Sequence, residues 1–141
     1  MTLKRSLTRV LLALSLSGFF FISNQSFGQA AEVAAAETEA TVSADGIPTD
    51  AARISEGESL FKANCTTCHR VHQKLVGPAL ANVTERAPSI EWIKNFIWNS
   101  SKVIASGDDY AVNLYEEYNK TQMTAFPTFK EEEIMSILAY I

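Results

Sequence analysis

The stretch that decides the fold is Cys65-Thr66-Thr67-Cys68-His69. Two thiols three residues apart lie one helical turn from each other, so both can bond to the two vinyl groups of one porphyrin. The histidine directly after the second cysteine is then placed to bind iron. The C-x-x-C-H form is typical of covalent haem attachment. The motif therefore predicts one haem c, held by Cys65 and Cys68, with His69 as an iron ligand.

Three other interpretations of the cysteine pair explain the sequence less completely. A redox-active dithiol of the thioredoxin kind expects a neighbouring βαβ pattern, and the sequence shows no period-2 strand. A zinc site needs four ligands, and the two cysteines with His69 and His72 are crowded into eight residues. A structural disulfide remains open for an exported protein, but it leaves His69 without a task.

The beginning of the chain predicts a secretory signal peptide over residues 1–30. Lys4, Arg5 and Arg9 precede an apolar or small run from Val10 to Ile22, followed by polar residues. This run is shorter than the roughly 20 residues that a membrane-spanning helix needs. We therefore expect a periplasmic or otherwise exported protein, which an uncleaved segment would instead tether to the membrane.

Residues 31–50 form an Ala/Glu-rich segment with no Lys, Arg or aromatic residue. Such a segment buries too little apolar surface to offset the entropy of ordering it, so it is interpreted as a flexible linker. The folded domain is then expected over residues 51–141.

The charge balance limits the choice of partners. Loss of residues 1–30 would remove three of the 12 Lys+Arg residues and none of the 16 Asp+Glu residues, which takes the formal charge from -4 to -7. Because phosphate binding needs a basic face, nucleic acid is not expected as a partner.

The hydrophobic pattern of the domain is helical throughout, which predicts an all-α fold. Two long loops, at residues 70–88 and 120–127, carry Gly77, Pro78, Pro88 and Pro127. Loops of that length in a small domain usually wrap around something. We expect about four short helices around one haem: Glu56 to Asn64 behind a Ser55/Glu58 capping box, a helix from Ile90 behind Ser89, Tyr110 to Asn119, and a last helix from Thr128 with Glu131 as capping partner.

Five short patterns occur in a telling order along residues 53–141: Gly57-x-x-x-Phe61, CTTCH, Gly77-Pro78-x-Leu80, Met123-Thr124-Ala125-Phe126-Pro127, and a final helix with Ile137 and Tyr140. Together they resemble the monohaem class I cytochromes c. The resemblance implies the cytochrome c fold, with the first and last helices crossing at Gly57.

The resemblance also implies further site residues. It assigns the second axial ligand to Met123, since Met135 lies in a periodic apolar helix where a thioether is usually core filling. It assigns to the Pro78 carbonyl the acceptance of the ring proton of His69. His72 is expected at the surface. Aromatic residues often approach a haem propionate in this family, but for Trp92 and Trp98 core packing is the better expectation.

Iron bound by histidine and methionine has no open position for a substrate, so the expected work is outer-sphere transfer of single electrons between redox partner proteins in an exported respiratory chain. The protein is then a carrier and not an enzyme. Two alternatives remain: a haem domain with an open or labile sixth site, acting as a peroxidase or gas sensor, and a haem module of a larger electron-transfer complex. The second would be favoured by a natural chain that continues well past Ile141.

The acidic balance is a departure from the mitochondrial members, which are basic and dock through lysines. Their partner recognition is therefore not carried over. A candidate basic patch for an acidic partner consists of Lys62, Arg70, Lys74 and Lys120.

Overall fold

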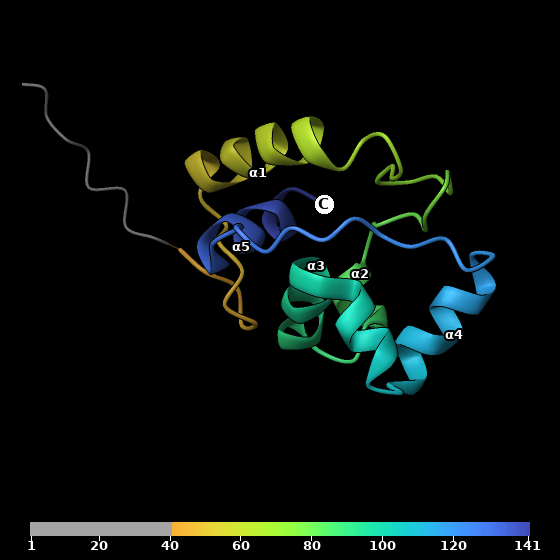
Figure 1. The fold of residues 1–141 in the computed structure, drawn as a ribbon. Helices are drawn as coiled ribbons and strands as arrows, with labels where there is room; N and C mark the ends of the chain where they lie inside the picture. The colour runs from red at the N-terminus through yellow and green to blue at the C-terminus, as the bar shows by residue number, and fades with distance from the viewer. Residues whose placement is uncertain (1–40) are drawn as a thin grey trace, which may run out of the picture. The chain divides into compact units, whose positions relative to one another are not determined.

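The computed structural model describes residues 41–141, which form helices joined by long loops (Figure 1). The predicted signal peptide, and the predicted linker up to residue 40, lie outside the described residues. Within residues 41–141 no helix combines the length and apolar character needed to cross a membrane. The predicted all-α fold is confirmed, with five helices in this part of the chain: α1 (Ala51–Asn64), α2 (Val83–Arg86), α3 (Ile90–Ala105), α4 (Asp109–Glu117) and α5 (Glu131–Tyr140).

Residues 41–50, the end of the predicted linker, form a small hydrogen-bonded turn. An isolated antiparallel bridge joins Val42 to Pro48, and the Thr49 amide donates to the Thr41 carbonyl at 2.8 Å. Ile47 is half-buried and packs against the hydrophobic core. Ordered backbone therefore precedes residue 51, because the side chain of Ile47 packs on the hydrophobic core.

Helix α1 begins earlier than the capping-box pattern predicts. Asp50 is its N-cap: the backbone there is extended, and a carboxylate oxygen accepts the Arg53 amide at 3.0 Å. Ser55, the predicted cap, lies inside the helix. That prediction was wrong because two polar residues compete for the N-cap, and the earlier one adds a further turn of helix.

Helix α5 begins later than predicted. Lys130 holds the N-cap position, and the Glu133 carboxylate accepts its backbone amide at 2.7 Å. The predicted cap, Thr128, lies in the preceding turn. The two middle helices agree better with expectation: Ser89 caps α3 as predicted, accepting the Trp92 amide at 3.0 Å, while α4 occupies 109–117 where 110–119 was expected.

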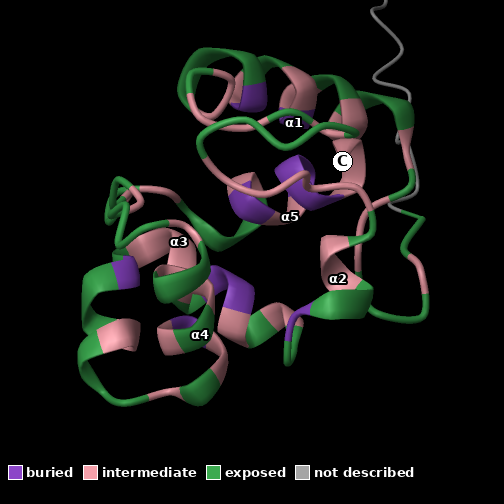
Figure 2. Cartoon of the chain, turned by 90° about the vertical axis from the view of Figure 1, so that its right-hand side faces the viewer, coloured by how far each residue is buried: buried purple, intermediate pink, exposed green. Residues whose placement is uncertain are grey.

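The crossing of α1 and α5 is the main helix-to-helix packing in the described chain (Figures 1 and 2). A Cβ at Gly57 would overlap the carbonyl group of Ser136 and lie 2.9 Å from the Ile137 nitrogen. Beside this contact the rings of Phe61 and Tyr140 lie 5.6 Å apart. The predicted close approach at Gly57 is therefore observed, and it buries Phe61 to 3% exposure.

Helix α3 is interrupted at Asn99, whose backbone angles (φ -161°, ψ 85°) are extended. The Asn99 side chain accepts the Lys102 amide at 3.0 Å, so it caps the second half of the helix as a new N-cap. Ser100, the first residue of that second half, is fully buried. The break separates residues 90–98 from residues 100–105 and turns Ser100 toward the loop that follows α4.

Candidate functional site

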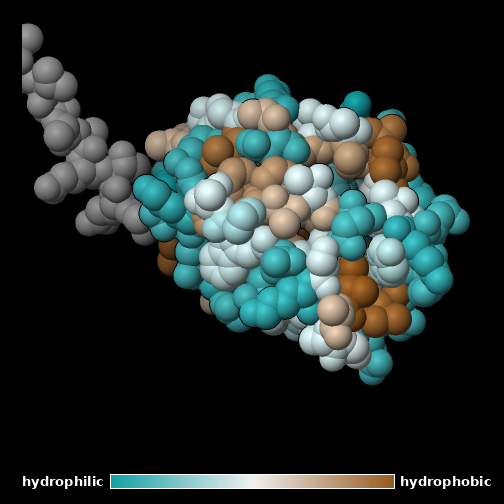
Figure 3. Space-filling model, in the orientation of Figure 1, coloured by the Kyte–Doolittle hydropathy of each residue, from teal (hydrophilic) through white to brown (hydrophobic). Residues whose placement is uncertain are grey.

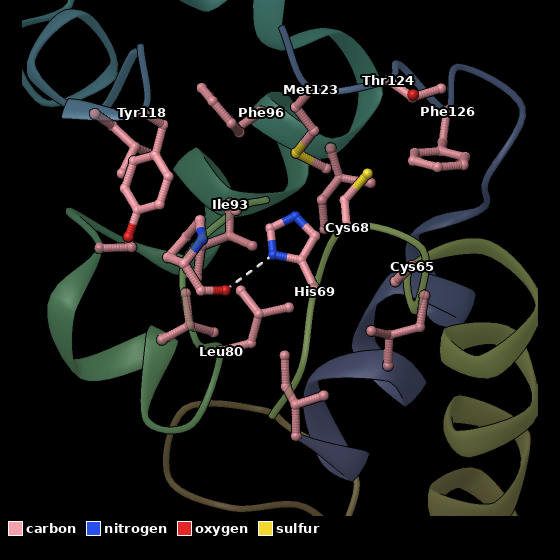
Figure 4. Close-up of a pocket in the computed structure, with 18 of the residues that line it drawn as sticks. Cys65, Cys68, His69, Leu80, Ile93, Phe96, Tyr118, Met123, Thr124 and Phe126 are labelled. Atoms are coloured by element: carbon pink, nitrogen blue, oxygen red, sulfur yellow. Dashed lines mark hydrogen bonds between the residues drawn. The ribbon is translucent and has the colours of Figure 1, made fainter. Parts of the chain in front are cut away.

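The cysteine motif continues directly from α1. The Cys65 amide donates to the Phe61 carbonyl at 2.9 Å, and the amides of Cys68 and His69 both donate to the Cys65 carbonyl, at 3.1 and 2.9 Å. This turn keeps the two half-buried thiols and the imidazole at one border of a single cavity (Figure 4). Helical geometry thus brings the three predicted attachment residues together.

The imidazole of His69 is held in one orientation by the loop that follows it. Its Nδ1 lies 3.0 Å from the Pro78 carbonyl oxygen. Since a carbonyl can only accept, Nδ1 carries the proton and Nε2 keeps a free lone pair, the state that binds a metal. The predicted partner of His69 is therefore the observed one.

Gly77 makes this orientation possible. A Cβ at this position would overlap the imidazole Cε1 and lie 2.9 Å from both ring nitrogens. Its amide donates to the Cys68 carbonyl at 2.9 Å, which draws the loop back over the motif. The absence of a side chain at Gly77 therefore leaves room for the ring of His69, whose second nitrogen is directed into the cavity (Figure 4).

The cavity is enclosed mainly by apolar side chains (Figure 4). They come from α1, α3, α4, α5 and the loops between them, so the interior of the domain surrounds this space. Prominent among the lining residues are Leu80, Ile93, Phe96, Ile97, Leu114, Tyr118, Phe126, Ile137 and Leu138.

Met123 lines the same cavity from the loop between α4 and α5, and Figure 4 shows its sulfur turned toward the His69 ring. The loop is tied to α3 on both sides of the break: the Ser100 hydroxyl donates to the Met123 carbonyl at 2.9 Å, and the Phe126 amide donates to the Ile97 carbonyl at 3.0 Å. Met135, the alternative ligand, packs against the hydrophobic core. His72 is exposed, as expected.

The chemistry of the thiols argues against the alternative interpretations. Burial, and to a smaller degree the neighbouring Cys68, raises the pKa of the Cys65 thiol to about 11. A reactive dithiol needs an attacking thiol with a lowered pKa, and Cys65 has the opposite shift. Both cysteines are free, without a bond between them. In the part of the chain that the structure describes, no group of three His, Cys, Asp or Glu side chains is close enough to hold a zinc ion.

These residues fit a haem. An apolar cavity inside the fold offers a nitrogen ligand and a thioether from opposite sides, and two thiols lie at its border. A soft thioether and an imidazole are both iron ligands found in haem proteins, while apolar walls match the faces of a porphyrin. His69 and Met123 would bind the iron, and Cys65 and Cys68 would hold the ring.

The two tryptophans serve in packing, as expected. The Trp92 indole donates to the Asp108 carboxylate at 3.1 Å, and the Trp98 indole donates to the Phe129 carbonyl at 2.8 Å. Both rings pack against the hydrophobic core. Because each indole N–H already has a protein acceptor, neither is left to bind a propionate.

The candidate basic patch is largely neutralised by its own surroundings. Lys62 pairs with Glu58 at 2.7 Å, Lys120 pairs with Glu116 at 3.3 Å, and Lys74 lies 3.9 Å from Glu117. Arg70 donates to backbone carbonyls of the haem motif turn. Three of the four positive charges are therefore balanced by neighbouring glutamates, and the charge of Arg70 is the one without a carboxylate partner among them.

The loop beyond the motif carries two of the exposed large apolar side chains, Leu75 and Val76, which are 45% and 48% exposed. On the face drawn in Figure 3, hydrophobic residues show among mostly hydrophilic ones. A small apolar area thus reaches the surface beside the border of the cavity.

Three parts of the site were not predicted from the sequence. Helix α2 falls within one of the predicted long loops, and it carries Arg86, a cation in the cavity wall that donates to the Ala79 carbonyl at 2.7 Å. The contact of Gly77 with the imidazole is the second. The break in α3 is the third, although the run Asn99-Ser100-Ser101 consists of residues that compete with helical hydrogen bonding.

Comparison with known proteins gives consistent matches. A family model described as Cytochrome c matches residues 54–141. A solved cytochrome c from Rhodothermus marinus is 37% identical, with a TM-score of 0.57 over 65% of this chain and 76% of that chain. An engineered cytochrome c from the same organism (Rma TDE), bound to a carbene intermediate (1-ethoxy-1-oxopropan-2-ylidene), is 36% identical, with a TM-score of 0.54 and the same coverage. No curated protein matches the chain.

Proposed function

The chain belongs to the cytochrome c family, and we propose that it carries single electrons through a haem c whose iron is bound by His69 and Met123. The match confirms the resemblance to class I cytochromes c and the all-α fold. It also confirms covalently bound haem c as the cofactor, for which Cys65 and Cys68 stand at the required spacing. As a member of this family the protein is an electron carrier that works with redox partner proteins.

The observation that carries the proposed ligation is the arrangement of His69 and Met123 about one cavity. The free Nε2 of His69 faces into it from one side, because Nδ1 is occupied by the Pro78 carbonyl at 3.0 Å. The Met123 sulfur is directed into it from the other side (Figure 4). Two fixed ligands leave no position for a substrate, which favours electron transfer over an enzymatic role.

The surrounding residues suit this role. When bound, a haem supplies one-electron chemistry between ferrous and ferric iron. The apolar walls exclude water, which disfavours the additional positive charge of the oxidised state. A thioether ligand also favours the reduced state, so His69 and Met123 together support a higher potential than two histidines would.

We further propose an exported location and a respiratory role, with the partner still unnamed. The basic N-terminal residues followed by the apolar run support the location. Because the lysines near the motif are paired with glutamates, steering by positive charge is not part of the proposal. The exposed apolar side chains of Leu75 and Val76 instead offer a contact area for a redox partner.

A pair of matched substitutions tests the ligation. Met123→Leu removes a thioether at nearly constant volume, and Met135→Leu does the same in the hydrophobic core. We expect Met123→Leu to retain the haem but to lose the methionine-to-iron charge-transfer band of the ferric protein, to lower its potential and to bind cyanide faster. Met135→Leu should keep the parent spectrum and potential.

The measurements are absorption spectra in both oxidation states, a redox titration and the intact mass of protein matured with haem. A parent protein that lacks the band and binds cyanide or CO at once would instead support the open-site alternative. An unchanged spectrum in Met123→Leu would rule out Met123 as the ligand. A colourless protein with no added mass would contradict the whole proposal.

A further inference from the structure

We propose that Ser100 is a positioning residue for Met123: its buried hydroxyl holds the backbone of the ligand loop and so sets how readily the methionine leaves the iron. The inference rests on the proposed ligation by Met123 and adds to it the residue that controls its strength. Nothing in the C-x-x-C-H motif or in the Met123 loop itself identifies Ser100, which belongs to a different helix.

The hydroxyl of Ser100 is fully committed. It donates to the Met123 carbonyl at 2.9 Å and accepts the side-chain amide of Gln122 at 2.7 Å. A hydroxyl has one proton to donate. Because Gln122 donates to the Ser100 oxygen, that proton is available for the hydrogen bond to the Met123 carbonyl. Ser100 has no exposed surface, which means that water cannot take over either bond without rearrangement.

The break in α3 is what makes this contact possible. In an uninterrupted helix a buried serine commonly bonds to a carbonyl of its own preceding turn. Here Asn99 is extended and caps the next turn, so Ser100 begins a new helical segment beside the loop. The same break leaves the Ile97 carbonyl accessible to the Phe126 amide, at 3.0 Å.

The loop itself has little that fixes the ligand. It leaves α4 through two consecutive residues with left-handed backbone, Asn119 and Lys120, and it then runs without helix or strand as far as α5. The hydrogen bonds to α3 at Met123 and at Phe126 hold the segment between them against the cavity. Removing the first of these loosens the backbone of the ligand, where the longer contact from the Gln122 side-chain amide to the Met123 carbonyl, at 3.5 Å, would remain. The thioether group itself is unchanged.

An incoming ligand reports on this restraint, since it binds iron only when methionine has left. We expect Ser100→Ala to lower the dissociation constant of imidazole for the ferric protein about tenfold, the factor by which loss of one buried hydrogen bond of ordinary strength changes an equilibrium. Ser101→Ala is the matched control: it alters the neighbouring exposed serine of the same helix and should leave the constant unchanged.

Gln122→Ala is the second variant, and it keeps the test decisive if Ser100→Ala does not fold. The exposed Gln122 orients the hydroxyl from outside, so its loss should lower the imidazole constant in the same direction but by less. The measurements are imidazole titration and the charge-transfer band, together with thermal unfolding of the haem-loaded protein.

The inference is supported if both variants bind imidazole more tightly in this order. It is overturned if the constant stays at the parent value, whether or not thermal stability falls, since a purely structural serine would lower only the stability. Failure of the underlying proposal looks different: Met123→Leu would then itself match the parent protein in its band and in imidazole binding.

Discussion

Gly57→Ala probes the crossing of α1 and α5 that closes the fold around the cavity. The added Cβ would fall on the Ser136 carbonyl group and within 2.9 Å of the Ile137 nitrogen. These are backbone atoms in the middle of a helix, so they cannot swing aside as a side-chain end can. The Cβ would overlap the Ser136 carbonyl oxygen, and Cβ contacts essentially never fall below 3.0 Å, so the two helices must move apart.

The cost follows from what the crossing buries. Phe61 and Ile137 are 3% and 4% exposed, and both lie beside the contact. Fully burying such a side chain contributes about 1.5–3 kcal/mol, so uncovering half of each costs about 2 kcal/mol. Strain from overpacking adds about 1–3 kcal/mol. Alanine returns about 1 kcal/mol through its better helix propensity. The net expectation is a loss of about 2–4 kcal/mol in the free energy of unfolding.

The assay is thermal unfolding of the haem-loaded protein followed by far-UV circular dichroism. For a domain of this size the loss corresponds to a midpoint lower by roughly 10 °C or more. Ser59→Ala is the control, because it places alanine at an exposed position of the same helix and should change the midpoint little. A midpoint for Gly57→Ala equal to or above that of the parent would mean that propensity alone acts there, and would refute the close approach.

Gly77→Ala should disturb the site more than the fold: the new Cβ displaces the imidazole, so we expect poorer haem incorporation and an altered absorption spectrum, and a normal yield and spectrum would contradict the contact. Asp50→Ala should cost about 1 kcal/mol of stability through loss of the α1 cap, while Ser55→Ala should cost less, which denaturant unfolding will measure. A larger loss in Ser55→Ala would mean that Ser55, and not Asp50, caps the helix. The hydrogen bonds that Lys94 donates to Glu131 and then to Glu91 raise the pKa of Lys94, so their stabilisation is present below the unfolded lysine pKa of about 10.4 and is lost as pH rises through the folded value. The Glu131→Gln variant should therefore be less stable than the parent at neutral pH, and it should lose less stability between neutral and alkaline pH. Denaturant unfolding at a series of pH values measures both. Identical pH profiles for the two proteins would mean that Glu131 does not act on Lys94.

The helix boundaries could be predicted only in part from the neighbouring residues. Ser89 was predicted correctly as a cap because the proline before it leaves a single candidate. The predictions of Ser55 and Thr128 as caps were wrong, because other polar residues nearby also bind the free amides in the first turn of a helix. Which residue becomes the cap depends on how much of each helix finds a neighbour to pack against, and that is not a local property.

The attachment motif, the helical periodicity and the candidate ligands were all readable from the chain, since each depends on residues within one or two turns of one another. The meeting of Met123 with His69 and the link from Ser100 to the Met123 loop depend on segments far apart in sequence. The room that Gly77 leaves for the imidazole depends on how the loop after the motif folds back. Only tertiary packing brings these groups together. The break of α3 at Asn99 places the Ser100 hydroxyl and the Ile97 carbonyl where the loop between α4 and α5 binds them, and α5 packs against α1 at Gly57. Local sequence therefore determined what chemistry is possible here, and tertiary contacts decided where each participating atom lies.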